Sequence, residues 1–104
     1  MGGEWTINNE YSMAGKNAVL EYNFFASKVF LVIRPGSLEQ NSEVRVFLDG
    51  KLVDNLNAGA DVESGIVTVD KDRLYNLIEL KNTGKHLLRL EFTPGIEVFA
   101  FTFG

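Results

Sequence analysis

The chain has 104 residues, of which 45% are hydrophobic and 23% charged, so it is long enough for one domain with its own core. It contains no cysteine, which excludes disulfides, thiolate metal sites and a cysteine nucleophile, and its single histidine, His86, excludes a multi-histidine metal site. A net charge of −4 without a basic cluster argues against nucleic acid as a partner. No apolar run is long enough to span a bilayer, so membrane insertion is not expected.

Hydrophobic residues alternate along most of the chain with a period of two, which predicts β-strands rather than helices. Pro35 and Gly36 end one apolar strand, and Asp49 followed by Gly50 predicts a tight hairpin turn. The segment 74–80 has either a helical face or a strand, and we favour a turn followed by a strand from Tyr75 that ends before 82–84. The polar stretch 37–42 is expected to be a loop. The expected strands are 5–7, 11–14, 18–25, 28–34, 44–48, 51–53, 66–69, 75–80, 86–92 and 96–103.

Short strands at even spacing, with turn signals between them, predict an all-β fold. Because the longer strands lie near both ends of the chain and must pair non-locally, an antiparallel jelly-roll β-sandwich is the expected architecture. Residues 4–104 form a single domain in this interpretation, and residues 1–3 are a linker or cloning remnant.

Candidate catalytic groups are few. His86 lies at the start of a predicted strand, where a hydrogen-bonding role is favoured over catalysis because nothing in the spacing orients it. Two carboxylate pairs, Asp61 with Glu63 and Asp70 with Asp72, fit either a small glycosidase or a calcium site, or else solvated turns, which we favour. The sequence therefore predicts no enzyme activity and no cofactor.

Aromatic residues make up 12% of the chain, and several fall on strands that are apolar on both faces. In the strand 28–34, Phe30 and Val32 are expected to face away from Val29, Leu31 and Ile33, so that both faces are apolar. In the last strand the phenylalanines either form the core or lie on a second apolar face that a partner or a flat ligand covers. The three phenylalanines in question are Phe99, Phe101 and Phe103.

The order of several short segments resembles a known family. The most specific segment is the ending PGIEVFAFTFG, residues 94–104, preceded by HLLRLEF. The other matching positions are Gly3 to Trp5, Tyr11, Ala14-Gly15, Val29 to Val32, Leu48 to Lys51, Gly59 to Val62, Gly65 to Val69, Arg73 to Tyr75 and His86 to Leu88. The chain resembles the C-terminal domain that follows the thioredoxin domain in DipZ-type and related thioredoxin-like proteins of bacteria.

This resemblance implies a jelly-roll domain similar to carbohydrate-binding modules, attached to a thioredoxin-like domain on the extracytoplasmic, or periplasmic, side of the membrane. The adjacent thioredoxin-like domain would then be a partner in the parent chain and would hold the paired cysteines for thiol–disulfide chemistry, which this chain lacks. The resemblance supplies no ligand-binding residues, and the fold alone is no proof of sugar binding.

Two functional hypotheses follow. The first is an accessory domain of a thiol–disulfide oxidoreductase that binds a glycan or positions the substrate protein. Its candidate ligand-binding residues are Trp5, Tyr11, Tyr22, Tyr75, Arg45 and Asp61. The alternative is a structural domain that docks on the adjacent thioredoxin-like domain through Phe30, Phe99, Phe101 and Phe103.

Overall fold

The structure, a computed structural model, describes residues 2–7, 10–36 and 42–104, and this part of the chain forms eight strands. Every strand pairs antiparallel with its neighbours, which confirms the all-β prediction. In the described residues no helix is long and apolar enough to cross a membrane. The strands are β1 (Trp5–Ile7), β2 (Ser12–Ala14), β3 (Val19–Arg34), β4 (Ser42–Leu48), β5 (Lys51–Leu52), β6 (Ile66–Val69), β7 (Arg73–Phe92) and β8 (Glu97–Phe103).

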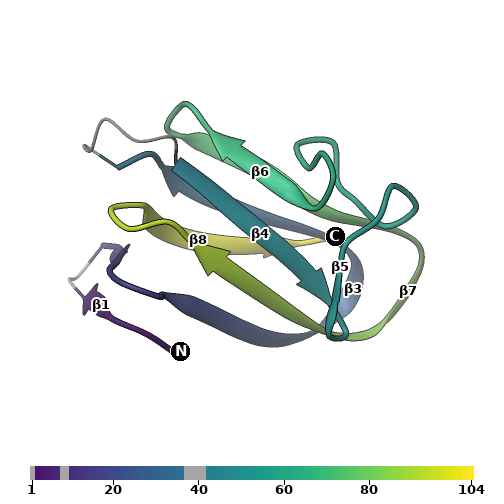
Figure 1. Cartoon of the computed structure of the whole chain (residues 1–104). Helices are drawn as coiled ribbons and strands as arrows, with labels where there is room; N and C mark the ends of the chain where they lie inside the picture. Colours follow the sequence, from purple (N-terminus) through teal and green to yellow (C-terminus); the bar gives the residue numbers. More distant parts are fainter. Residues whose placement is uncertain (1, 8–9, 37–41) are drawn as a thin grey trace.

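Two long strands, β3 and β7, run through both layers of the fold (Figure 1). Residues 19–26 of β3 pair with residues 84–91 of β7, and β4, β5 and β6 continue this first sheet. The other halves of β3 and β7 pair with each other and form the second sheet with β8, β2 and β1. In Figure 1 the first sheet is viewed from its outer side, with β4 in front.

Alternate side chains of both sheets fill the space between them. Val44 and Val46 of β4 and Leu88 and Leu90 of β7 are fully buried, as is Leu31 of β3. These β-branched and leucine residues favour pleated strands and place one apolar face inward. The side chains between them therefore point outward and give each sheet an outer face of its own.

The sequence predicted two strands where the structure has one long β3, and two more where it has one long β7. The pairing shifts where Ala26 is opposite Gly84 and Lys28 is opposite Glu79, so residues 80–83 of β7 lie opposite Ser27 alone. Residues 80–83, which include the turn-like Asn82 and Thr83, therefore form a bulge at which the two strands bend together from one sheet into the other. The prediction of separate strands was wrong, but the interruption predicted at 82–84 corresponds in position to this bulge.

Several local predictions are confirmed. Asp49 and Gly50 both have positive φ, 52° and 85°, as a two-residue hairpin turn between β4 and β5 requires. The segment from Tyr75 is a strand within β7. Most of the predicted loop, residues 37–41, lies outside the described residues.

The outer face of the second sheet is apolar, as predicted for Phe30 and Val32, which are half-buried while Leu31 is buried. In β8 the phenylalanines divide between the core side and the outer face. A register shift between Leu31 and Ile33 places an extra residue in β8, so Phe101 lies opposite Leu31 on the core side. Phe99, before the shift, packs on Tyr11 at the outer face.

Candidate functional site

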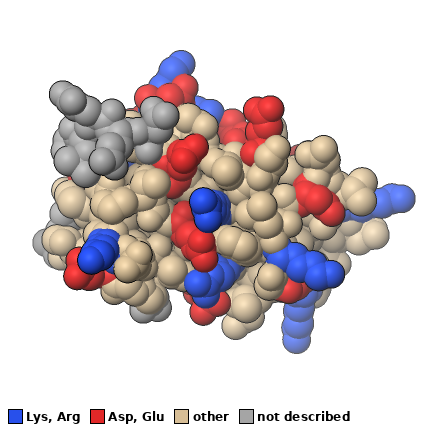
Figure 2. All heavy atoms as spheres, viewed as in Figure 1, with Lys and Arg blue, Asp and Glu red and all other residues tan. Residues whose placement is uncertain are grey.

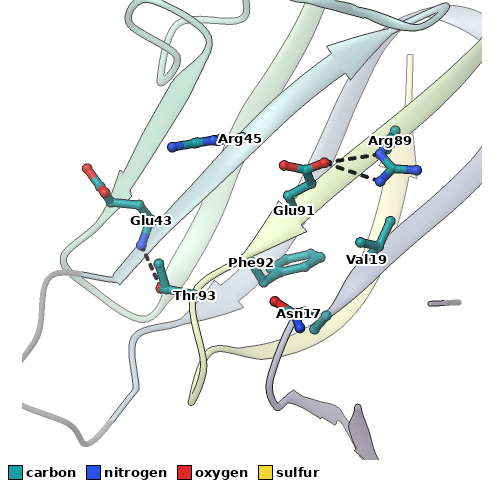
Figure 3. A pocket seen from close by; sticks show the side chains of 9 residues that line it. Asn17, Val19, Glu43, Arg45, Arg89, Glu91, Phe92 and Thr93 are labelled. Carbon is teal, nitrogen blue, oxygen red and sulfur yellow. Dashed lines mark hydrogen bonds and ion pairs between the residues drawn. The ribbon is translucent and has the colours of Figure 1, made fainter. Parts of the chain in front are cut away.

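A hollow lined by charged side chains lies on the outer face of the first sheet and has a volume of about 410 Å³ (Figure 3). Its charged side chains come from neighbouring strands, because β4 pairs with the second half of β7 and places Arg45 opposite Glu91. Their inward neighbours Val44 and Leu90 are buried, so strand alternation directs the charged residues outward. The hollow is lined by Asn17, Ala18, Val19, Glu43, Arg45, Arg89, Glu91, Phe92 and Thr93.

One half of the hollow is fixed by an ion network. The guanidinium of Arg89 donates through Nε and Nη2 to Oε2 of Glu91, each at 3.2 Å, and through Nη1 to Oε2 of Glu21 at 3.4 Å. The contact with Glu21 is solvent-exposed and the contact with Glu91 is part-buried, so the network contributes little to stability but orients the side chains. It places the hydrogen-bonded carboxylate of Glu91 at the hollow.

The other half contains a cation without a partner. Arg45 is exposed and makes no ion pair or hydrogen bond with any residue that the structure describes, although Glu91 is opposite it on β7. Figure 3 shows its side chain extending from β4 beside the hollow. Figure 2 shows that positive and negative side chains alternate on this face. The hollow therefore offers free donors next to carboxylate acceptors.

Backbone contacts hold the rim of the hollow. The amide of Glu43 donates to Oγ1 of Thr93 at 3.0 Å, and the amide of Thr93 donates to the carbonyl of Glu43 at 3.1 Å. Asn17 has a positive φ of 55°, in the left-handed region that asparagine tolerates well. These contacts keep the lining residues in place without using the guanidinium of Arg45.

The structure does not gather the six predicted ligand-binding residues at one place. Only Arg45 lies in the hollow. The Trp5 indole donates to the carbonyl of Gly2 at 2.8 Å and packs edge-on against Phe92, so it supports the hollow from below. Tyr22 is 47% exposed but stacks at the flank of the fold, away from the lining residues.

Tyr75 was wrong as a ligand-binding residue, because it is fully buried. Its hydroxyl accepts from the amides of Asp70 and Lys71 and donates to the carbonyl of Lys71 at 2.7 Å. The polar end of the side chain is therefore bound within the fold, and the buried ring has no face left for a ligand. The guanidinium of Arg73 lies 3.9 Å from the ring centre. Tyr75 is a core residue of the second sheet.

Both carboxylate oxygens of Asp61 accept hydrogen bonds within the fold, in the same region as Tyr75. Its Oδ1 accepts from Nη2 of Arg73 at 2.9 Å, and its Oδ2 accepts from the amide of Asn76 at 2.7 Å. The hydrogen bond from Arg73, followed by that from Asn76, lowers the pKa of Asp61 against the opposing effect of burial. Asp61 thus fastens the loop before β6 to β7. A Cβ on Gly59, in the same loop, would approach the carbonyl oxygen of Asn76 to 2.3 Å, which explains the glycine there.

The four predicted docking residues divide between two surfaces. Phe30 and Phe99 lie at the outer face of the second sheet. Phe101 and Phe103 stack with Tyr22, at centroid distances of 5.7 and 5.5 Å, at the open flank between the sheets. One flat partner surface would therefore not cover all four.

His86 lies within β7 and not at the start of a strand, but it has the hydrogen-bonding role that the sequence favoured. Its Nδ1 lies 2.6 Å from Oδ2 of Asp49, whose Oδ1 accepts from the amide of Leu87 at 2.8 Å. The hydrogen bond with His86, followed by that with Leu87, lowers the pKa of Asp49. These contacts fasten the β4–β5 turn to β7.

Both aspartates of the pair Asp70 and Asp72 have partners within the fold. Asp70 lies 3.1 Å from the Tyr75 hydroxyl, and Asp72 pairs with Arg34 at 3.2 Å. In the described part of the chain no group of three or more His, Asp or Glu side chains could hold a metal ion.

Sequence reasoning missed Arg89, Glu91 and Glu43 as lining residues of the hollow. A signal was present, because each alternates with buried neighbours in its strand and must point outward. What could not be read from the sequence is that β4 pairs with the second half of β7.

Comparison with known families decides the relationship. Residues 1–104 match the family described as the thioredoxin-like C-terminal domain. The chain belongs to this family. The chain contains no cysteine. No curated protein sequence matches it.

Solved structures share its fold. A family two carbohydrate esterase from Clostridium thermocellum in complex with cellohexaose superimposes with a TM-score of 0.73 at 17% identity, covering 96% of the domain. An active-site mutant of a family two carbohydrate esterase from the same organism gives a TM-score of 0.72, also at 17% identity and 96% coverage. The domain spans 29% of each esterase chain. At this identity the likeness shows the fold alone.

Proposed function

We propose that this domain is a non-catalytic accessory module of an extracytoplasmic thioredoxin-like oxidoreductase, and that the hollow on its first sheet binds a carbohydrate. The family supports the accessory role. The observation that supports carbohydrate binding most is the unpartnered guanidinium of Arg45 beside the ordered carboxylate of Glu91.

The charge balance of the hollow fits a neutral ligand rich in hydroxyl groups. Its two cations, Arg45 and Arg89, are balanced by two carboxylates, Glu43 and Glu91. Sugar hydroxyls both donate and accept, so they can bind alternating guanidinium and carboxylate groups, whereas a polyanion would be repelled by the carboxylates. The similar esterase structure that contains cellohexaose makes a cello-oligosaccharide the first ligand to test.

A neutral apolar patch completes the site. Val19 and the edge of Phe92 line the hollow beside the charged groups. Sugar rings present C–H groups to such patches while their hydroxyls bind polar side chains. The hollow thus combines the two kinds of contact that a pyranose requires.

Calorimetric titration of the domain with cellohexaose, alongside a glycan array, tests this proposal. Wild type is expected to bind at least one glycan, and Arg45→Ala and Glu91→Gln are each expected to weaken that binding by about tenfold, which is the loss of one charged hydrogen bond. Lys81→Ala, in the bulge of β7 outside the hollow, is the matched control. An array without hits, together with unchanged Trp5 fluorescence on adding oligosaccharides, would overturn it.

A second candidate function, docking on a neighbouring thioredoxin-like domain, is favoured by the apolar outer face of the second sheet. Leu74 is 45% exposed there, opposite Val32, and Phe30 and Phe99 are half-buried. Titration of the labelled domain with an isolated thioredoxin-like domain from the same parent would shift the amides of this face. Unchanged amides would exclude the docking.

A further inference from the structure

The first half of β3 has a free edge. On one side residues 19–26 pair with β7, while on the other side only Gly2 is bound, exchanging two backbone hydrogen bonds of 2.9 Å with Val19. Among the described residues no further strand joins this side until β8 pairs with β3 from Val29 onward. In Figure 1 this half of β3, in dark blue, runs along the lower border of the molecule.

Three residues direct their backbone groups away from β7 along this edge. Hydrogen-bonding direction alternates along a strand, and the β3–β7 register does not shift between Val19 and Ala26. Since Val19 bonds outward to Gly2, the N–H and C=O groups of Glu21, Asn23 and Phe25 also point outward. No described residue satisfies these six groups. The free stretch, residues 20–25, contains one charge and no proline, so it lacks the common protection against edge pairing.

We propose that this edge pairs with the same edge of a second copy of the chain, antiparallel about a two-fold axis at Asn23. In this register Asn23 lies opposite the partner's Asn23, and Glu21 lies opposite the partner's Phe25, so all three outward residues are paired. A shift by two residues would place one of them opposite either Val19, which Gly2 already occupies, or Ser27, beyond the register shift. The free edge is therefore complementary to itself in one register only.

Side chains agree with this register. Tyr22, 47% exposed, would lie opposite the partner's Phe24 on the inner side. Within one protomer Tyr22 already stacks on Phe101 and Phe103, so the new aromatic pair would extend this stack across the axis. On the outer side Phe25, 68% exposed, would be covered by the methylene groups of the partner's Glu21.

Five paired residues make a small interface, so we expect weak association that depends on concentration. Sedimentation equilibrium of the full chain, in a series reaching millimolar protein, is expected to show a monomer–dimer equilibrium. Asn23→Pro removes an N–H that points outward, so β3 keeps its bonds to β7, but the two central hydrogen bonds of the dimer are lost. Its dimer dissociation constant is expected to rise by about tenfold or more, whereas Asn23→Ser, which keeps the N–H, should match wild type.

A charge exchange tests the register itself. Phe25→Glu places a second carboxylate opposite the partner's Glu21 and is expected to weaken the dimer. Adding Glu21→Lys to Phe25→Glu places opposite charges across the axis and should restore it. A chain that stays monomeric at every concentration, or a dimer that both Asn23→Pro and Phe25→Glu leave unchanged, would overturn the proposal. Neither result depends on carbohydrate binding.

Discussion

Two arginines in different regions of the domain show how a cation without a partner among the described residues differs from one whose charge is satisfied within the fold. Arg45, in the hollow on the first sheet, is exposed and has no partner among the described residues. Arg73, at the edge of the second sheet, donates to Asp61 at 2.9 Å and lies 3.9 Å above the ring of Tyr75. Both residues are cations on strands, yet only Arg73 has its charge satisfied within the fold.

This difference predicts that substitutions of the two kinds of side chain change different properties, the stability of the fold in one case and the affinity for a ligand in the other. A side chain whose partners are all internal stabilises the fold, and its removal leaves other groups unsatisfied. A side chain without internal partners can be removed at little cost in stability, so its loss should be felt in binding alone.

Asp61→Ala is expected to cost about 2 kcal/mol, because the guanidinium of Arg73 and the partly buried amide of Asn76 both lose their acceptor. Urea denaturation followed by Trp5 fluorescence measures the change. Glycan affinity, measured on the folded variant, should stay at the wild-type value. Loss of affinity without loss of stability would instead make Asp61 a ligand-binding residue.

Tyr75→Phe is expected to cost about 1 kcal/mol, because the amides of Asp70 and Lys71 lose the hydroxyl that accepts from them. Thermal unfolding compared with wild type measures it. Tyr22→Phe is the matched control and should be nearly neutral, because Tyr22 is half exposed. Equal effects at the two tyrosines would contradict the buried role of Tyr75.

A smaller effect is expected from pH. The hydrogen bond from Arg73 lowers the pKa of Asp61 in the folded state. A carboxyl group of this kind stabilises the fold above its ordinary pKa, and this contribution is lost as the pH falls through the lowered value. The difference in unfolding free energy between wild type and Asp61→Asn should therefore shrink in acid. A difference that stays constant with pH would show that the charge of Asp61 is unimportant.

Arg45→Ala is expected to change the free energy of unfolding by no more than about 0.5 kcal/mol, as for an exposed residue without contacts. Chemical denaturation checks this, and the same protein should show weakened glycan binding. Destabilisation comparable to that of Asp61→Ala would mean that Arg45 belongs to the fold and not to the binding surface.

The sequence predicted what depends on neighbouring residues. Alternation placed Val44 and Val46 inward, and the Asp49-Gly50 turn has the predicted positive φ values. Tyr75 was misjudged because its chemical type suits sugar stacking, while its burial depends on amides that a turn brings to its hydroxyl.

Longer-range features were not predictable in the same way. The hollow exists because β4 pairs with the second half of β7, and strand pairing between distant segments leaves no local signal. The bulge at 80–83, followed by Gly84, has the composition of a turn, since exposed polar residues suit both. The order in which distant strands pair thus decides which outward-facing side chains become neighbours.

The central claim, that the hollow binds carbohydrate, is tested most directly by titrating the isotopically labelled domain with cellohexaose and following every amide by NMR. The account predicts shifts that cluster at Val19, Glu43, Arg45, Arg89 and Glu91, and that Arg45→Ala needs about tenfold more ligand to reach the same shifts. Absence of shifts at millimolar ligand, or shifts confined to the outer face of the second sheet around Phe30 and Leu74, would contradict it.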